Sequence, residues 1–311
     1  MELVLYGSIA WRHPLGMAQV IDWASQYGGD AVDARGMSLD IYGDVPQRLA
    51  AFGYDMLGPR QIRHSARKDL RQRLEERGKR LVSLYCSSPV NLTGEVGNHG
   101  RELFREYLQL AADLGAEWVR AINNTLQGVR ESVVTLEESY MRTVEGLRTV
   151  SATARELGIG ILLENNENTV TPDADSLVRM KHDLQDVCRV GIAYDPVNAY
   201  FQGLNPEGGL DIIGSALSML HLKNVRRHDN AAWNYIPRGD FSYEWTSLAD
   251  GDLNWPQLLQ HAADLDFDGP LVYEHLNPFK GMPSAYWDSL PEPAEAAQTE
   301  AIYLRGLLEK L

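Results

Sequence analysis

The amino-acid sequence predicts an α/β protein folded as a single closed (β/α)8 TIM barrel over residues 1–311. Eight short apolar runs typical of buried strands lie near residues 3, 31, 81, 118, 160, 191, 218 and 271. A helical pattern follows each run, and strict alternation of strand and helix is typical of a parallel sheet with helices outside it. Eight such units favour a closed barrel. The main alternative is an open doubly wound sheet, but no G-x-G-x-x-G sequence follows any of the runs.

Glycines and capping residues mark the ends of the expected helices. These helices are expected over residues 14–27, 61–77, 102–114 and 135–157, from about 171, from 254 to about 268, and over 293–308. Gly28, Gly78 and Gly115 each follow a helical pattern. Glycine is typical of this position, because it adopts the left-handed conformation that ends a helix with little strain. Thr135 and Glu138 have the spacing of a capping box.

Two connections are longer than the short loops that join strands and helices in compact barrels. Residues 36–59 follow the second expected strand, and residues 224–253 form a long loop after the seventh. The latter is rich in aromatic residues: Trp233, Tyr235, Phe241, Tyr243 and Trp245. Long loops at the carboxyl ends of barrel strands commonly cover the active site or contact another subunit. We therefore expect residues 224–253 to form a lid or a subunit contact.

The composition is typical of a soluble globular protein and argues against nucleic-acid binding and membrane insertion. Of 311 residues, 44% are apolar and 23% are charged, and the formal net charge is −14. A protein that binds a phosphate backbone normally carries a basic face, and no window approaches the run of about 18 apolar residues needed to span a bilayer. Only Cys86 and Cys188 are present, and the first residues show no basic segment before a strand pattern, so we expect no signal peptide. We therefore expect a cytoplasmic protein.

Polar residues stand directly after the last four apolar runs. They are Glu164, Asp195, His221 and Glu274. If these runs are strands 5–8 of a parallel barrel, their carboxyl ends meet at the end where barrel active sites form. Three carboxylates and one imidazole suit a hard or borderline divalent cation. We expect Mn²⁺, with Mg²⁺ or Co²⁺ as alternatives and Zn²⁺ less favoured.

The alternation of side chains along a strand predicts further residues of the pocket. A residue two positions after an inward-facing ligand also faces inward, so Asn166 and Lys223 would join Glu164 and His221. We expect Lys223 to hold a substrate hydroxyl or an oxyanion. Two residues at the ends of the first and second strands are candidates for contacts with sugar hydroxyls: Trp11 and Arg35.

Short segments around these residues resemble a known superfamily. The segments are Leu163-Glu164-Asn165, Asp195-Pro196-Val197-Asn198, His221-Leu222-Lys223-Asn224, Gly251-Asp252-Leu253-Asn254-Trp255, Tyr273-Glu274 and Gly29-Asp30-Ala31-Val32-Asp33. In these segments the sequence is similar to the xylose-isomerase-like barrel superfamily. That superfamily includes sugar isomerases, ketose 3-epimerases, inosose dehydratases and relatives of endonuclease IV.

The resemblance implies a metal shell made of Glu164, Asp195, His221 and Glu274. In the ketose epimerase branch the two glutamates lie on either side of the substrate. Here Glu164 and Glu274 would be catalytic: one would remove a proton from the carbon beside a metal-bound carbonyl, and the other would return it. This division of roles is chemically coherent, because the metal stabilises the developing enediolate and two carboxylates can act as base and acid.

The resemblance also indicates substrate contacts and two departures from the epimerase pattern. Arg227, six residues after His221, falls where the epimerases carry a substrate-binding arginine. Asn198 falls where ketose epimerases have a substrate-contacting histidine, and we count it among the substrate-binding candidates. Val170 falls where they have a substrate-binding glutamate. The two departures favour a divergent member of the superfamily.

The leading hypothesis is a metal-dependent isomerase or epimerase that acts on a small sugar or keto-polyol. The alternative is a metal-dependent lyase, either a dehydratase of the inosose type or an enzyme that eliminates the aglycone from a 3-keto-glycoside, because the same enolate chemistry expels a leaving group β to the carbonyl. An endonuclease is disfavoured by the acidic charge, and a non-catalytic barrel by the complete ligand set. We expect a homo-oligomer, with a hetero-complex as the alternative.

Overall fold

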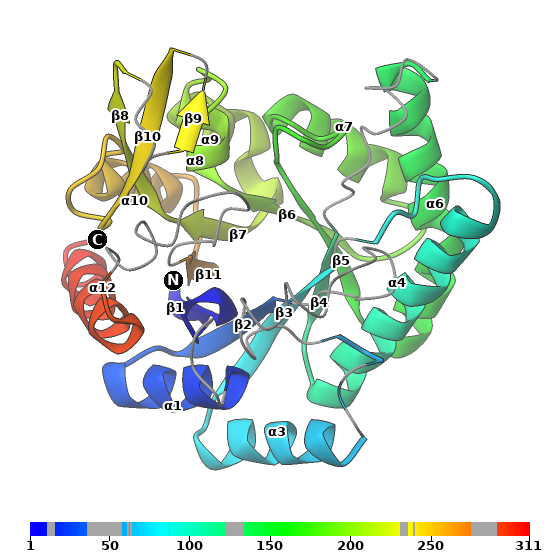
Figure 1. Cartoon of the computed structure of the whole chain (residues 1–311), viewed down its shortest axis with the longest axis horizontal. Coiled ribbons are helices and arrows are strands. Elements are labelled where there is room, and N and C mark those ends of the chain that lie inside the picture. The colour runs from blue at the N-terminus through cyan, green and yellow to red at the C-terminus, as the bar shows by residue number, and fades with distance from the viewer. Residues whose placement is uncertain are drawn as a thin grey trace.

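The structure, a computed structural model, describes residues 1–10, 16–35, 58–60, 62, 64–86, 88–121, 134–230, 236–238, 240–274 and 291–311. Eight parallel strands form a closed barrel in the neighbour order β1-β11-β7-β6-β5-β4-β3-β2 (Figure 1). The strands are β1 (Glu2–Tyr6), β2 (Ala31–Arg35), β3 (Arg80–Cys86), β4 (Trp118–Ala121), β5 (Gly160–Glu164), β6 (Val190–Tyr194), β7 (Leu217–Leu222) and β11 (Pro270–Tyr273). The predicted barrel is therefore confirmed, at all eight predicted strand positions.

Closure depends on β1, which pairs in parallel with both the second and the last barrel strand. Leu3 lies opposite Leu271 of β11, and Val4 lies opposite Ala31 of β2. A closed parallel sheet has no unpaired edge and brings the carboxyl ends of all eight strands to one end of the barrel.

Helices surround the barrel and cover the outer face of its strands (Figure 1). They are α1 (Met17–Tyr27), α3 (His64–Glu76), α4 (Gly94–Leu114), α6 (Leu136–Leu157), α7 (Ala174–Leu184), α8 (Pro196–Tyr200), α9 (Pro206–Ile213), α10 (Trp255–Asp264) and α12 (Pro293–Leu308), with short 3₁₀ turns at η1 (Gly7–Ala10) and η3 (Gly214–Ala216). The Thr135 side chain accepts a hydrogen bond from the Glu138 amide at 3.1 Å, which is one of the two bonds of the predicted capping box. Gly28 and Gly115 end α1 and α4 at positive φ, as predicted.

The buried apolar side chains form two groups, because strand residues alternate between the two faces of the barrel wall. A large cluster packs between the strands and the helices. A smaller cluster fills the barrel interior and contains Val4, Tyr6, Ala31, Val82, Leu162, Ala193, Met219 and Val272. The interior set shows which positions of each strand face the barrel axis.

Helix α4 begins at Gly94, earlier than the predicted start at residue 102. The prediction missed this first part because glycine is a poor helix former. The glycines serve packing instead: a Cβ on Gly97 would collide with the Leu92 carbonyl oxygen, and a Cβ on Gly100 would lie 2.6 Å from the Pro89 carbonyl oxygen. The first apolar run of the sequence, residues 3–10, is a strand only as far as Tyr6, since residues 7–10 form η1.

The segment expected to be a long loop after the seventh barrel strand contains an antiparallel sheet. Strands β8 (Asn224–His228), β9 (Ile236–Arg238) and β10 (Phe241–Thr246) pair in the order β8-β10-β9. The prediction of a loop over residues 224–253 was therefore wrong, and the aromatic residues that suggested a lid are typical of strands. Tyr243 and Trp245 of β10 are buried. Of the other long connection, 36–59, only residues 58 and 59 lie within the described residues.

Within the described residues, no helix combines the length and the apolar character needed to cross a membrane.

A buried carboxyl group joins the last helix to the loop after β10. Glu300 of α12 is 4% exposed, and its carboxylate oxygens accept hydrogen bonds from the Leu248 amide at 3.1 and 3.3 Å. Burial raises the pKa of Glu300 from 4.5 to about 7. The native state therefore binds a proton between these two pH values that the unfolded chain has lost, and the free energy of unfolding falls as the pH rises through this window.

Glu300→Gln should remove this pH dependence, because the amide oxygen still accepts from Leu248 but never becomes charged. We expect the free energy of unfolding of the variant, relative to wild type, to rise by about 2 to 3 kcal/mol between about pH 5 and about pH 8. Urea denaturation of both proteins across this range measures the difference. A difference that stays constant with pH would contradict the assignment.

Candidate metal centre

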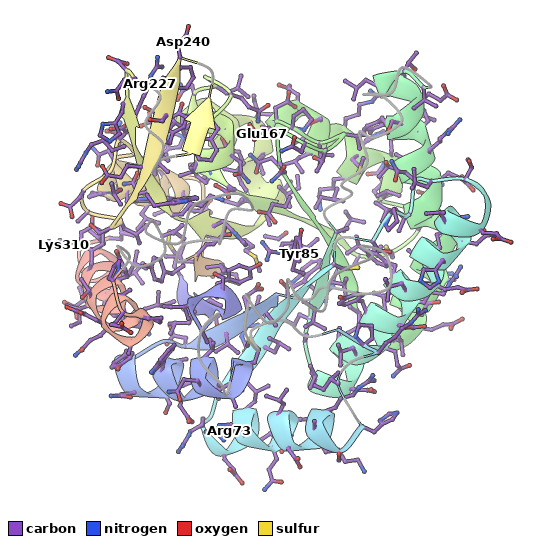
Figure 2. The ribbon with its side chains drawn as sticks, in the orientation of Figure 1. Arg73, Tyr85, Glu167, Arg227, Asp240 and Lys310 are labelled. Atoms are coloured by element: carbon purple, nitrogen blue, oxygen red, sulfur yellow. The ribbon has the colours of Figure 1, made fainter. Side chains whose placement is uncertain are left out.

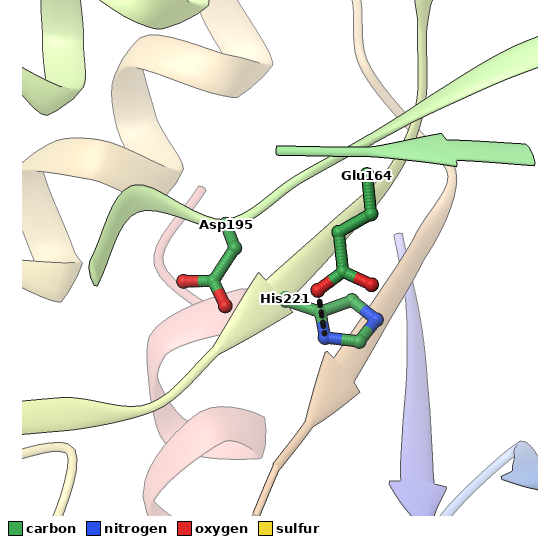
Figure 3. Close-up of side chains that lie close together, drawn as sticks. All are labelled: Glu164, Asp195 and His221. Atoms are coloured by element: carbon green, nitrogen blue, oxygen red, sulfur yellow. Dashed lines mark ion pairs between the residues drawn. The ribbon is translucent and has the colours of Figure 1, made fainter. Parts of the chain in front are cut away.

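Three of the four predicted metal ligands lie together at the carboxyl ends of neighbouring strands. Glu164 ends β5, Asp195 follows β6 directly, and His221 lies in β7. Each offers one ligand atom, and these atoms lie within 4.8 Å of one another (Figure 3). The exposed fractions of Glu164, Asp195 and His221 are 3%, 0% and 0%. The three residues are called the triad below.

Strand alternation explains why these side chains converge. Each residue of the triad stands two positions after a side chain of the interior cluster: Leu162 precedes Glu164, Ala193 precedes Asp195 and Met219 precedes His221. Since the strands are parallel and neighbouring, the next inward-facing position of each strand falls at the same end of the barrel.

Glu274 lies beside the triad, directly after β11 and two residues after the interior residue Val272. Its Oε2 is 3.5 Å from His221 Nδ1 and 3.3 Å from the ammonium nitrogen of Lys223. Burial alone would raise the pKa of Glu274, but Lys223 and His221 outweigh burial and hold this pKa below its ordinary value. Glu274 is therefore ionised at neutral pH.

Asp195 is held in place by the backbone at the start of α8. Its Oδ1 accepts hydrogen bonds from the amides of Val197 and Asn198 at 3.0 and 3.1 Å. Its Oδ2 is fully buried and pairs with the Lys223 ammonium at 2.6 Å. A buried carboxylate oxygen needs a donor or a positive partner, and Lys223 supplies one here.

His221 has the protonation state that metal binding requires. Burial, and after it the nearby Arg120, lower the pKa of His221, so its imidazole is neutral at neutral pH. A neutral imidazole can donate a lone pair to a metal ion. Two carboxylates and one neutral imidazole fit a hard or borderline divalent cation.

Lys223, predicted to contact substrate, lies against the predicted ligands. Its ammonium nitrogen pairs with Asp195 at 2.6 Å and Glu274 at 3.3 Å, and lies 5.7 Å from the centre of the Trp245 ring. Burial alone would lower the pKa of Lys223, but Asp195 and Glu274 outweigh burial and hold this pKa above its ordinary value. The side chain is therefore a fixed positive charge beside the triad.

Two charged residues of the barrel interior were missed by the sequence analysis. Arg120 of β4 lies 2.7 Å from Glu164 Oε2, and its other terminal nitrogen lies 3.3 Å from Asp33 Oδ1 of β2. Burial raises the pKa of Asp33 to about 6, although Arg120 opposes this effect. Strand alternation could have found both residues, since Asp33 follows Ala31 of the interior cluster by two positions and Arg120 follows Trp118, which packs against that cluster.

Asn198 and Asn166 were both predicted to contact substrate, but their side chains form hydrogen bonds with nearby backbone groups. Asn198 donates from its side chain to the Asn165 carbonyl oxygen at 2.9 Å, and the Asn165 amide group bonds the backbone of Asp195. The Asn166 Oδ1 accepts from the Asn168 amide at 3.0 Å. Asn198 thus helps to fix the turn after β5 to the turn after β6.

Arg227 lies on the small antiparallel sheet. Its guanidinium stacks on Phe241 at 4.2 Å and pairs with Asp229 at 3.4 Å. Figure 2 shows Arg227 on the outer part of this sheet, away from Tyr85, whose ring contacts Arg120 in the barrel. The remaining two predicted contacts, Trp11 and the side chain of Arg35, lie outside the described residues.

A closed parallel barrel with a buried carboxylate and histidine triad at the carboxyl ends of its strands defines a class of metal-binding barrels. The sequence profile of the xylose isomerase-like TIM barrel family matches residues 21–305. The chain belongs to this family, and the resemblance inferred from its sequence motifs is confirmed.

Comparison with individual proteins shows the same fold at low sequence identity. The chain is 24% identical to the uncharacterized protein YfiH of Bacillus subtilis (strain 168), over 56% of this chain and 66% of that protein, slightly under two thirds of its length. A crystal structure of D-psicose 3-epimerase in the presence of D-fructose superposes with a TM-score of 0.71, 16% identity and 99% coverage of both chains. The IolI protein with a bound zinc atom gives a TM-score of 0.71, 16% identity and coverage of 100% and 99%.

A third similar structure is the probable 3-DHS dehydratase AsbF of Bacillus anthracis. It gives a TM-score of 0.66 and 16% identity, covering 98% of this chain and 99% of that chain.

Asp195→Asn should abolish most divalent-cation binding while keeping the fold. The asparagine Oδ1 can still accept from Val197 and Asn198, whereas the buried negative charge is lost. We expect the dissociation constant for Mn²⁺ to rise at least about 100-fold, more than the loss of an outer contact would cause. Isothermal titration calorimetry measures this constant.

The matched control is Glu167→Gln, which removes a half-buried carboxylate near the end of β5 (Figure 2). This variant should bind Mn²⁺ as the wild type does. Equal affinity in Asp195→Asn and wild type would remove Asp195 from the ligand set.

Proposed function

We propose that the chain is a divalent-metal-dependent isomerase or epimerase of a small sugar or keto-polyol. The observation that carries this proposal is the approach of two carboxylates to His221. Glu164 Oε1 lies 3.8 Å from its Nδ1, and Glu274 Oε2 lies 3.5 Å from the same nitrogen. The similarity in fold to D-psicose 3-epimerase supports the same reaction class.

Glu164, Asp195 and His221 would hold the cation, with Glu274 as the fourth ligand. When bound, a divalent cation supplies a Lewis acid that stabilises negative charge developing on a substrate carbonyl oxygen. The oxygen-rich donor set favours Mn²⁺, with Mg²⁺ or Co²⁺ as alternatives. Since the IolI structure contains zinc, Zn²⁺ belongs among the ions to be compared.

The two glutamates would divide the proton transfer between them. Glu274 is ionised and so can accept the proton from the carbon beside the carbonyl. Glu164, protonated by exchange with solvent, would return a proton to that carbon or to its neighbour, and Glu274 would lose its proton to solvent. Lys223 restrains Glu274 through its contact with Oε2, and Arg120 restrains Glu164 in the same way. Fixed carboxylates reduce the reorganisation that proton transfer requires.

A second candidate function is a metal-dependent lyase that eliminates water or an aglycone β to a carbonyl. The specific observation in its favour lies at Asn198 and Val170, where the epimerase pattern has substrate-binding residues. Asn198 is bonded to the Asn165 carbonyl oxygen, and Val170 is buried in the apolar core. The dehydratase AsbF has a similar fold.

The small sheet of β8, β9 and β10 is proposed to act as the lid or the subunit contact predicted for this segment. Its inner side carries Trp245, whose ring lies beside Lys223, so a substrate at the triad would lie close to this sheet. A homo-oligomer remains our expectation, with a hetero-complex as the alternative.

Exchange of a substrate proton with solvent tests the proposed reaction directly. With Mn²⁺ in ²H₂O, the wild type should incorporate deuterium beside the carbonyl of a keto-sugar, as detected by NMR. Glu274→Gln should lower the exchange rate by about 10²- to 10⁴-fold, because the amide cannot accept the proton. Chelation of the metal should abolish exchange, and Mn²⁺ should restore it.

Mass spectrometry of the product separates the two candidates. A product of unchanged mass supports isomerisation or epimerisation, whereas loss of water or of an aglycone supports the lyase. Glu167→Gln serves as the control with wild-type exchange. A metal-loaded wild type that exchanges no proton in any keto-sugar or keto-polyol would overturn both.

A further inference from the structure

Arg120 is neither a proposed metal ligand nor a proton donor or acceptor in the proposed reaction. It nevertheless contacts Glu164 and His221. It is 1% exposed and lies in the barrel interior. One terminal nitrogen of its guanidinium lies 2.7 Å from Glu164 Oε2. The other lies 3.3 Å from Asp33 Oδ1, and the rings of Tyr6 and Tyr85 lie 5.0 and 5.4 Å from the guanidinium carbon.

The contact between Arg120 and His221 is made over the ring. The nitrogen that contacts Glu164 lies 2.8 Å from His221 Nε2 and 3.3 Å from His221 Nδ1. Comparable distances to both ring nitrogens place it against the face of the imidazole, because the lone pair of one ring nitrogen and the N–H of the other point outward in the ring plane. Arg120 thus packs on the ring face and occupies neither in-plane direction, and His221 Nδ1 lies 3.5 Å from Glu274 Oε2.

The same nitrogen selects which oxygen of Glu164 faces His221. Arg120 holds Oε2, and Oε1 then lies 3.8 Å from His221 Nδ1 (Figure 3). A glutamate has three side-chain torsions, so without such a contact its carboxylate would adopt several orientations.

Asp33 fixes the other side of the guanidinium. Its Oδ1 pairs with Arg120, and its Oδ2 accepts a hydrogen bond from the Ser83 hydroxyl of β3. Asp33 is fully buried, so the pair has little freedom to rearrange. The contacts form a path from Ser83 through Asp33 and Arg120 to the triad.

We propose that Asp33 and Arg120 form a positioning pair for the metal centre, in which Asp33 orients Arg120 and Arg120 holds Glu164 and His221 in the arrangement that binds the cation. This inference rests on the proposed function. It adds two residues that act through the ligands, since neither is itself a ligand.

The substitution Arg120→Lys separates the effect of the positive charge of Arg120 from the effect of its planar shape. Lysine keeps the positive charge, but its single ammonium group cannot span Asp33 and Glu164 as the planar guanidinium does. If Arg120 positions the ligands, Arg120→Lys should raise the dissociation constant for Mn²⁺ by about 10- to 100-fold. Asp33→Asn should raise it by about 10-fold, although Asp33 contacts no member of the triad.

The double variant Asp33→Asn with Arg120→Lys distinguishes positioning from a long-range effect of charge. When Arg120 is already replaced, Asp33 has nothing left to orient, so the double variant should bind Mn²⁺ as weakly as Arg120→Lys alone. Full additivity of the two effects would show that Asp33 acts through its charge and would overturn the proposal.

The experiment is calorimetric titration of each purified full-length chain with MnCl₂ near neutral pH, with the electron paramagnetic resonance spectrum of bound Mn²⁺ as the second readout. A changed spectrum in Arg120→Lys reports altered ligand geometry, which a loss of stability alone would not produce. Arg67→Lys, a half-buried arginine of α3 paired with Asp113, is the matched control and should bind as wild type.

Three results would count against these conclusions. Wild-type affinity and spectrum in Arg120→Lys would overturn the positioning role and leave the metal centre intact. Equal weakening in Arg67→Lys would show a general effect of replacing arginine and would also overturn it. Failure of the wild type to bind any of Mn²⁺, Mg²⁺, Co²⁺ or Zn²⁺ would overturn the metal centre and the positioning pair together.

Discussion

The burial of four carboxylates in one barrel dominates the physical chemistry of this protein. Asp33, Glu164, Asp195 and Glu274 are each at most 6% exposed, and an ionised carboxylate removed from water without a partner costs several kcal/mol. Two buried cations from the chain, Arg120 and Lys223, each contact two of these carboxylates. These four carboxyl groups share two cations from the chain, and a divalent cation at the triad would add positive charge to the same cluster.

The barrel architecture places these charges together and keeps them apart from the helices. Inward-facing positions of parallel neighbouring strands lie in layers. Asp33, Glu164, Asp195 and Glu274 each stand two residues after an apolar residue of the interior cluster. Tyr6 of that cluster pairs in register with Asp33 and so lies in the same layer as the charged side chains. The outward-facing positions of the same strands pack against the helices and form the larger apolar core. Stability and chemistry thus use alternate residues of the same strands.

The turns after β5 and β6 connect the fold to the selection of substrate. The Asn198 side chain donates to the Asn165 carbonyl oxygen, and the Asn165 side chain bonds the backbone of Asp195. Both side chains thus help to position Asp195, a proposed ligand. The sheet of β8, β9 and β10 adds an aromatic wall through Trp245 beside Lys223. Of these residues, Asn198 departs from the ketose epimerase pattern and bears on which small molecule the proposed enzyme would accept.

The sequence by itself determined the barrel, the family and the convergence of Glu164, Asp195 and His221. Alternating strand and helix patterns are local, and closure of eight parallel strands brings their carboxyl ends together whatever the loops do. The start of α4 was beyond such reasoning, because its glycines are selected by contacts with residues 89–92 and not by helix propensity.

Only the tertiary structure decided which charged groups pair inside the barrel. Lys223 was predicted to face inward, but its pairing with Asp195 and Glu274 depends on the spacing of three strands. Arg120 meets Asp33 and Glu164 from strands far apart in the chain. The residue pattern of one strand shows the direction of a side chain, whereas a contact across the barrel depends on strand register and barrel diameter, which only the closed sheet establishes.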